Sequence, residues 1–283
     1  MTSLPALTPL LALIESDSSS SVEYVIGGKA LSDSAREAAA ELLAEDAVEI
    51  ACGDSPLLKS WRLSRAGGPA HTGSKLRALE TYVGIAFGLP SKPTNANHLQ
   101  GHVAELIWNR VIQERAVCRD GRRLVHAHPV KADPLEPGGD GLVIYQNCGG
   151  VLVFRLWEIK KHDTKQTNLV SATISRASQQ LSDRGHEYLA KLAGPETTTK
   201  GGPLGDLYAD MVELWFDRSV RAGVGISVGT SDHHAPDKPS AFGAIAAKFP
   251  EFNTAGQTES IVVAVPDFPG FAEQVRGIVW SGL

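Results

Sequence analysis

The feature of this 283-residue chain that most limits its fold is an apolar run that ends in alternating charges. Residues 151–160 read VLVFRLWEIK, a composition that predicts a buried strand. A carboxylate and an ammonium near the end of such a strand are costly to bury unless they bind something. Glu158 and Lys160 are therefore the first candidates for a functional site.

A second strand is predicted just upstream, at residues 141–145, and residues 147–150 (NCGG) between the two runs have the composition of a tight turn. A three-residue loop centred on Gly149 makes the two strands a hairpin of defined register. In that register the opposed positions are 144 with 154, 142 with 156, and Asp140 with Glu158.

This register gathers charge at one end of the hairpin. Directly opposed side chains lie about 5 Å apart at Cβ, so Asp140 and Glu158 repel each other unless a cation lies between them. Lys160 falls on the same face as Glu158, about 6.6–6.8 Å further along the strand. The register is the decisive assumption, because a slip of one residue turns Asp140 to the other face.

Two acids and a lysine at a strand end are suited to metal-dependent phosphodiester cleavage. Hard oxygen ligands favour Mg²⁺ or Mn²⁺, and a bound metal neutralises phosphate charge and acidifies a water molecule. Lys160 is then expected to activate the water or stabilise the transition state. The simpler alternative is a surface hairpin whose ends carry solvated charges.

With these residues in place, the chain resembles the PD-(D/E)XK nuclease superfamily over roughly residues 95–190. The superfamily pattern is an acid on one strand and Asp/Glu-x-Lys on the next, matched here by Asp140, Glu158 and Lys160. Gly139 stands where many members have proline. The resemblance implies an α/β fold with a central mixed β-sheet flanked by helices, a restriction-endonuclease-like core carrying N- and C-terminal elaborations.

The superfamily usually adds a glutamate from a preceding helix. Residues 95–112 have apolar residues at helical spacing, and Asn95 or Asn97 is a candidate cap. Glu105 lies within this segment and is the third metal ligand that the resemblance implies. An ordinary glutamate of an amphipathic helix is the alternative.

The layout of the whole chain also resembles the nuclease subunit of Hachiman-type bacterial anti-phage systems, which acts with a superfamily 2 helicase. This implies a DNA-cleaving effector controlled by a helicase partner, whereas the superfamily resemblance implies products that carry a 5′-phosphate. Two alternatives stay open: a non-catalytic interaction subunit on a nuclease-like scaffold, and an RNA-cleaving toxin.

Composition limits how such a protein reaches nucleic acid. The net charge is -5, so the chain has no overall basic field and needs a local patch, a metal or a partner. Three scattered cysteines, without metal-binding spacing, favour a reducing cytoplasm. The apolar stretch at residues 4–14 lacks a preceding basic residue and is too short to span a membrane.

Two regions are expected: an N-terminal helical or α+β elaboration at 1–93, and a nuclease-like domain with a C-terminal strand–helix extension at 94–283. Around the hairpin the patterns predict a sequence of further elements. They predict helices at 35–44, 72–87, 166–192, 204–221 and 268–280, strands at 48–52, 223–230 and 260–265, and a strand or helix at 4–14.

Several other groups are weaker candidates. Residues 68–75 resemble a phosphate loop but have Gly-Ser-Lys where that motif needs Gly-Lys-Ser/Thr. The others are possible phosphate contacts, metal ligands or alternative acids, each with a solvated surface residue as the competing interpretation. They are Arg115, Arg119, Arg122, Arg123, Lys161, His162, Lys165, Gln179, Gln180, Asp232, His233, His234, Asp133 and Asp163.

Overall fold

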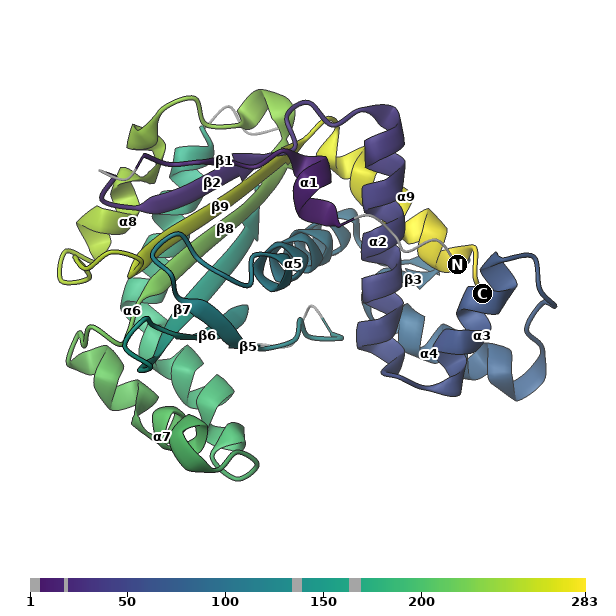
Figure 1. Ribbon diagram of the computed structural model, residues 1–283. Coiled ribbons are helices and arrows are strands. Elements are labelled where there is room, and N and C mark those ends of the chain that lie inside the picture. The colour runs from purple at the N-terminus through teal and green to yellow at the C-terminus, as the bar shows by residue number, and fades with distance from the viewer. Residues whose placement is uncertain (1–5, 18–19, 134–138, 163–168) are drawn as a thin grey trace.

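The computed structural model describes residues 6–17, 20–133, 139–162 and 169–283. Its centre is a curled, mixed seven-stranded sheet in the order β1-β2-β9-β8-β7-β6-β5 (Figure 1). The fold is therefore α/β with a mixed sheet flanked by helices, as the sequence predicts. The strands are β1 (Ile14–Glu15), β2 (Glu23–Gly27), β5 (Arg123–Ala127), β6 (Gly141–Gln146), β7 (Leu152–Lys161), β8 (Val224–Ser231) and β9 (Thr258–Val265).

The sheet combines both strand orientations. The four strands β2, β9, β8 and β7 are mutually parallel. The pairs β1–β2, β7–β6 and β6–β5 are antiparallel. The central strands are buried on both faces, which explains their nearly continuous apolar sequences.

Helices cover the two faces of the sheet with separate apolar cores. On one face lies α5 (Ala96–Glu114), and on the other lie α6 (Val170–Glu196), α7 (Gly202–Phe216) and the short α8 (Gly243–Lys248). Along β7 the side chains alternate between these cores, with Trp157 and Ile159 towards α5 and Phe154 and Leu156 towards α6. The site residues of β7 therefore follow this alternation.

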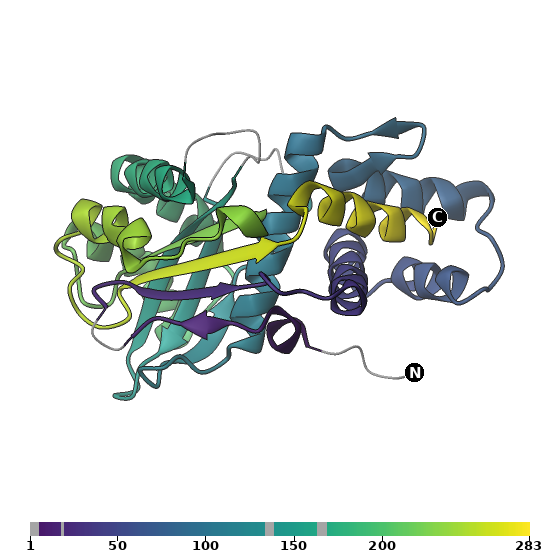
Figure 2. The same ribbon diagram turned by 90° about the horizontal axis from the view of Figure 1, so that it is seen from above.

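A helical lobe stands beside the sheet on the α5 side (Figures 1 and 2). The indole N–H groups of Trp61 and Trp280 donate to the carbonyls of Val279 and Gly88, at 2.9 and 3.0 Å, and tie the C-terminal helix into the lobe. The lobe consists of α2 (Asp33–Cys52), α3 (Pro56–Arg65), α4 (Gly73–Phe87) and α9 (Phe268–Trp280), with the short hairpin β3 (Gly88–Leu89) and β4 (Lys92–Pro93).

The strand predicted at 48–52 is wrong, because these residues form the last turns of α2. The Ser32 hydroxyl accepts from the Ala35 N–H and caps that helix, and its alanine-rich body continues through the short apolar run. At the N-terminus the stretch predicted as strand or helix contains α1 (Leu7–Leu11). Helix α6 also extends past its predicted end, through Pro195.

Helix α5 packs unusually closely against the start of β6. Gly141 faces the ring of Trp108, and a Cβ at Gly141 would overlap that ring. Trp108 in turn lies 5.9 Å from Trp157 of β7, measured between ring centroids. This contact brings the turn of α5 that carries Glu105 beside the residue that precedes β6, which is Asp140.

Candidate active site

The register of the β6–β7 hairpin agrees with the sequence prediction. Ile144 pairs with Phe154 and Leu142 pairs with Leu156, and the ladder ends at Gly141 and Trp157. Asp140 therefore lies one residue beyond the end of β6, next to the β7 segment that carries Glu158.

Past the last paired residues of β6, the side chain of Asp140 supplies a hydrogen-bond acceptor for β7. Its Oδ2 accepts a hydrogen bond of 2.8 Å from the main-chain N–H of Ile159. The carboxylate is thereby fixed at the open end of the hairpin, where the edge of β7 has lost its antiparallel neighbour.

Lys160 joins the two acids. Its ammonium forms an ion pair with Oε1 of Glu158 and lies 3.6 Å from Oδ2 of Asp140. The three charged groups that the hairpin prediction placed together are therefore together, on the face of β7 that Phe154 and Leu156 turn towards α6.

Glu158 is the most constrained member of the group. It is fully buried, and its Oε1 is in contact with the Lys160 ammonium. Burial raises the pKa of its carboxyl, the charge of Asp140 adds to this, and Lys160 opposes it. A buried carboxylate whose only described counter-charge is one ammonium is the kind of group that a bound cation stabilises.

Glu105 approaches the same place from the other face of the sheet. Burial and the charge of Asp140 raise the pKa of its carboxyl to about 8, although Lys131 and Lys160 act to lower it. The site thus contains three acidic side chains against two lysines within electrostatic reach. The helix glutamate implied by the resemblance lies in the electrostatic field of this group.

The residues partly fit a divalent cation. Mg²⁺ keeps several waters and is commonly held by one or two carboxylates, which Asp140 and Glu158 supply. In the described part of the chain, however, no three His, Cys, Asp or Glu side chains are grouped closely enough to hold a metal ion. Glu105 is therefore a member of the charged group, but not a third ligand in the arrangement observed.

Helix α6 contributes a residue that the sequence analysis did not identify. Tyr188 is buried, its hydroxyl accepts from the Gln180 amide at 2.9 Å, and it packs against Gly139, the residue before Asp140. The spacing of Gln180 and Tyr188 by eight residues, about two helical turns, is the signal that was available in the sequence. Gln179 instead donates to Asp183 on the helix surface.

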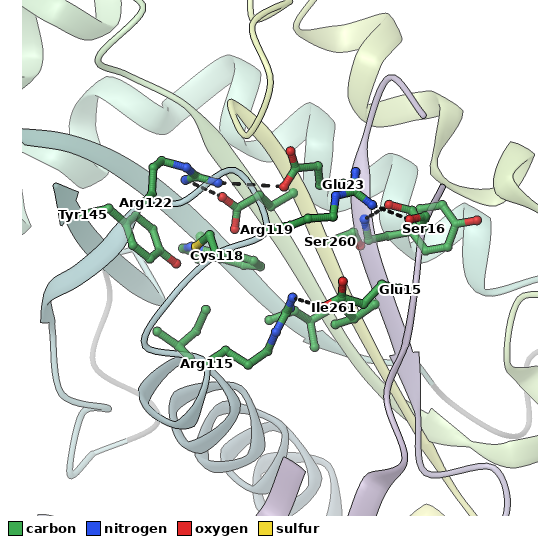
Figure 3. A pocket seen from close by; sticks show the side chains of 15 residues that line it. Glu15, Ser16, Glu23, Arg115, Cys118, Arg119, Arg122, Tyr145, Ser260 and Ile261 are labelled. Atoms are coloured by element: carbon green, nitrogen blue, oxygen red, sulfur yellow. Dashed lines mark hydrogen bonds and ion pairs between the residues drawn. The ribbon is translucent and has the colours of Figure 1, made fainter. Parts of the chain in front are cut away.

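The arginines that follow α5 have their own partners around a separate pocket (Figure 3). Arg122 is buried and pairs with Glu259 at 2.7 Å and with Asp120, while Arg155 lies 3.7 Å from Glu259. Arg115 pairs with Glu15 at 2.7 Å, and Arg119 donates to main-chain oxygen. As observed, these groups stabilise the junction of the 115–123 loop with β2 and β9.

The remaining candidates lie apart from the acidic group or at its edges. Lys161 donates to Asn97 at 2.6 Å on the α5 side, and His162 is buried against Thr173 and His234. His233 is exposed and Asp133 is exposed. Residues 68–75 run from the end of α3 into α4 in the helical lobe, and Asp163 and Lys165 lie outside the described residues.

No protein-family model matches the sequence, and a search of curated proteins found no match. No helix in the described ranges is long and apolar enough to cross a membrane.

Proposed function

We propose that this protein is a divalent-cation-dependent nuclease that cleaves DNA at the end of the β6–β7 hairpin. The observation that carries the proposal is the convergence of Asp140 and Lys160 on the fully buried carboxylate of Glu158, for which Lys160 is the described counter-charge. A cation bound there would supply charge neutralisation on the phosphate and acidify a water molecule.

In this proposal the chain's own residues divide the work. Asp140, held by the Ile159 N–H, and Glu158 are the oxygen donors for the cation. In the observed state the ammonium of Lys160 lies against both acids and offsets their charge. With a cation bound, Lys160 would contact the phosphate or the attacking water, and Glu105 would add a further acidic group.

The cellular role rests on the resemblance of the chain's layout to a helicase-linked anti-phage nuclease. We propose a cytoplasmic bacterial defence effector whose superfamily 2 helicase partner supplies DNA affinity and restrains cleavage. The acidic net charge of -5 fits such a division, because a protein without a basic field gains DNA affinity from its partner.

The test compares plasmid and linear DNA degradation in Mg²⁺, Mn²⁺ and EDTA, with the protein alone and with a candidate helicase. Glu158→Gln and Lys160→Met are expected to abolish cleavage. The exposed Glu251→Gln and Lys191→Met are matched controls that should cleave normally. Cleavage by Glu158→Gln at the wild-type rate would refute the proposal, and RNA run beside the DNA separates a ribonuclease.

A non-catalytic scaffold is the second candidate, favoured by two observations. The described residues contain no grouped set of three metal-binding side chains, and Glu158 is fully buried. On this interpretation Glu158→Gln and Lys160→Met leave phage protection intact in cells, whereas a nuclease loses protection with either change.

A further inference from the structure

Positive charge is concentrated in one part of this acidic chain. Residues 55–95, from the cap of α3 to the cap of α5, contain six basic side chains and one acid, a net charge of +5 against -10 for the rest of the chain. The two arginines of α3 pair with acids of α2. Lys75, Arg77 and Lys92 are exposed, and none of them forms an ion pair with a residue that the structure describes. The helical lobe therefore presents positive charge that its own acids do not neutralise.

The lysine and arginine of α4 share the exposed side of that helix with an aromatic ring. Lys75 and Tyr82 are seven residues apart, about two helical turns, and therefore lie one above the other. Tyr82 is 43% exposed and Ile85 is 47% exposed. Glu80, the one acid of the segment, lies on nearly the opposite side of the helix from Tyr82, since two residues advance an α-helix by more than half a turn. The exposed side of α4 is thus both basic and apolar.

Helix α4 leads from the edge of the lobe to the helix that carries Glu105. The loop between α3 and α4 forms the edge of the lobe farthest from the sheet (Figures 1 and 2). At the other end of α4, Phe87 packs edge to face against His102 of α5, with 5.3 Å between ring centroids. His102 lies one turn before Glu105. The axis of α4 therefore points from the outside of the lobe towards the part of α5 nearest the candidate active site.

We propose that the exposed side of α4, with the β3–β4 hairpin that follows it, binds single-stranded DNA. Lys75, Arg77 and Lys92 contact the phosphates, and Tyr82 stacks on a base. The proposal names the substrate class of the proposed nuclease and rests on that function. Cations bind any nucleic acid through the release of its counterions. An exposed aromatic ring beside them selects unpaired bases, because the faces of those bases are free to stack.

The decisive experiment measures binding of a fluorescent oligothymidine by anisotropy in EDTA, over a range of NaCl concentrations. EDTA excludes contacts through a divalent cation, so the affinity reports the protein's own side chains. The lobe variant carries Lys75→Gln, Arg77→Gln and Lys92→Gln. The control variant lowers the net charge equally by changing three exposed lysines outside the lobe to glutamine, namely Lys191, Lys238 and Lys248.

We expect the lobe variant to bind more weakly, with a slope of log affinity against log salt that is smaller by about 2, or about 0.7 for each lost phosphate contact. The control variant should keep the slope of the wild type. Tyr82→Ala should weaken binding about 5-fold or more at an unchanged slope, and Tyr82→Phe should restore it. Phe216→Ala, which removes an exposed ring of α7, should bind as the wild type does.

The outcomes separate this proposal from the nuclease. If the lobe and control variants have the same slope, or the wild type does not bind in EDTA, the α4 surface is not a DNA site, whether or not the protein cleaves. If binding depends on the lobe cations but Mg²⁺ and Mn²⁺ produce no cleavage, the α4 surface stands and the nuclease falls. If a duplex binds more tightly and Tyr82→Ala has no effect, the single-strand assignment is wrong. Competition by polyglutamate as effective as that by unlabelled oligothymidine would mean that the surface takes an acidic protein, and would overturn the proposal.

Discussion

The main-chain N–H of Ile159 donates to the carboxylate of Asp140 at 2.8 Å, just where the β6–β7 ladder stops. An ordinary hairpin end leaves such a donor to water or to another strand. Here the donor fixes an acid beside a second, buried acid. The hydrogen bond therefore links the end of a strand pair directly to the charge arrangement of the candidate site.

This relationship predicts different effects for two substitutions of Asp140. Asp140→Asn keeps an oxygen acceptor for Ile159 and removes the repulsion of Glu158, so metal-free stability should be equal or higher by up to about 1 kcal/mol. Asp140→Ala removes the acceptor and should cost about 0.5–1.5 kcal/mol. Urea unfolding in EDTA checks both, and a large loss in Asp140→Asn would mean that the acids do not repel each other.

The raised pKa values predict a pH dependence with a definite sign. Burial raises the pKa of Glu105 to about 8 from an ordinary value of 4.5, and that of Glu158 is raised as well. Between pH 4.5 and pH 8 the carboxyl of Glu105 is protonated in the folded protein but ionised in the unfolded chain. Metal-free stability should therefore fall as pH rises from about 4.5 to 8. Glu105→Gln should reduce this slope in unfolding curves taken across that range.

The affinity for a divalent cation is expected to rise with pH over this range, whereas metal-free stability falls. A cation displaces protons from carboxyls with raised pKa values, so Mn²⁺ affinity should increase from pH 6 to 8. At 100 times the dissociation constant, Mn²⁺ should add about 2.7 kcal/mol to the stability of the wild type. Thermal shift with Mn²⁺ and with EDTA measures this, and an equal shift in Glu158→Gln would contradict the assignment of the ligand.

The contact between Gly141 and Trp108 predicts that one methyl group will disturb the site. Gly141→Ala overlaps the indole and forces α5 and β6 apart, which should cost about 1–3 kcal/mol and move Glu105 relative to Asp140. Cleavage should fall with stability. Gly149→Ala in the hairpin loop, where the added carbon meets only an ordinary contact, is the control. If both variants cleave equally, the close approach of α5 to β6 is not what positions the acidic residues for cleavage.

Much of the hairpin could be predicted because its information is local. Side-chain alternation and a short turn are sufficient to define the partners of residues 142 and 144, and the observed ladder has the same register. The strand predicted at 48–52 failed because five apolar residues at the end of an alanine-rich helix look the same as a short buried strand.

The place of Tyr188 could not be derived in this way. Tyr188 lies near Asp140 only because α6 packs against Gly139, the residue before it. Periodicity assigns such residues to a helix face, but it does not say which strand end that face will cover.

The amino-acid sequence by itself determined that an acid, a glutamate and a lysine meet at one end of a β-hairpin, since strand alternation depends on chain order alone. The tertiary structure decided that Glu158 is fully buried against the Lys160 ammonium, and that Glu105 lies in the electrostatic field of these groups. Burial and the approach of separate elements depend on packing across the whole molecule, and it is this packing that raises the pKa of Glu105 and Glu158.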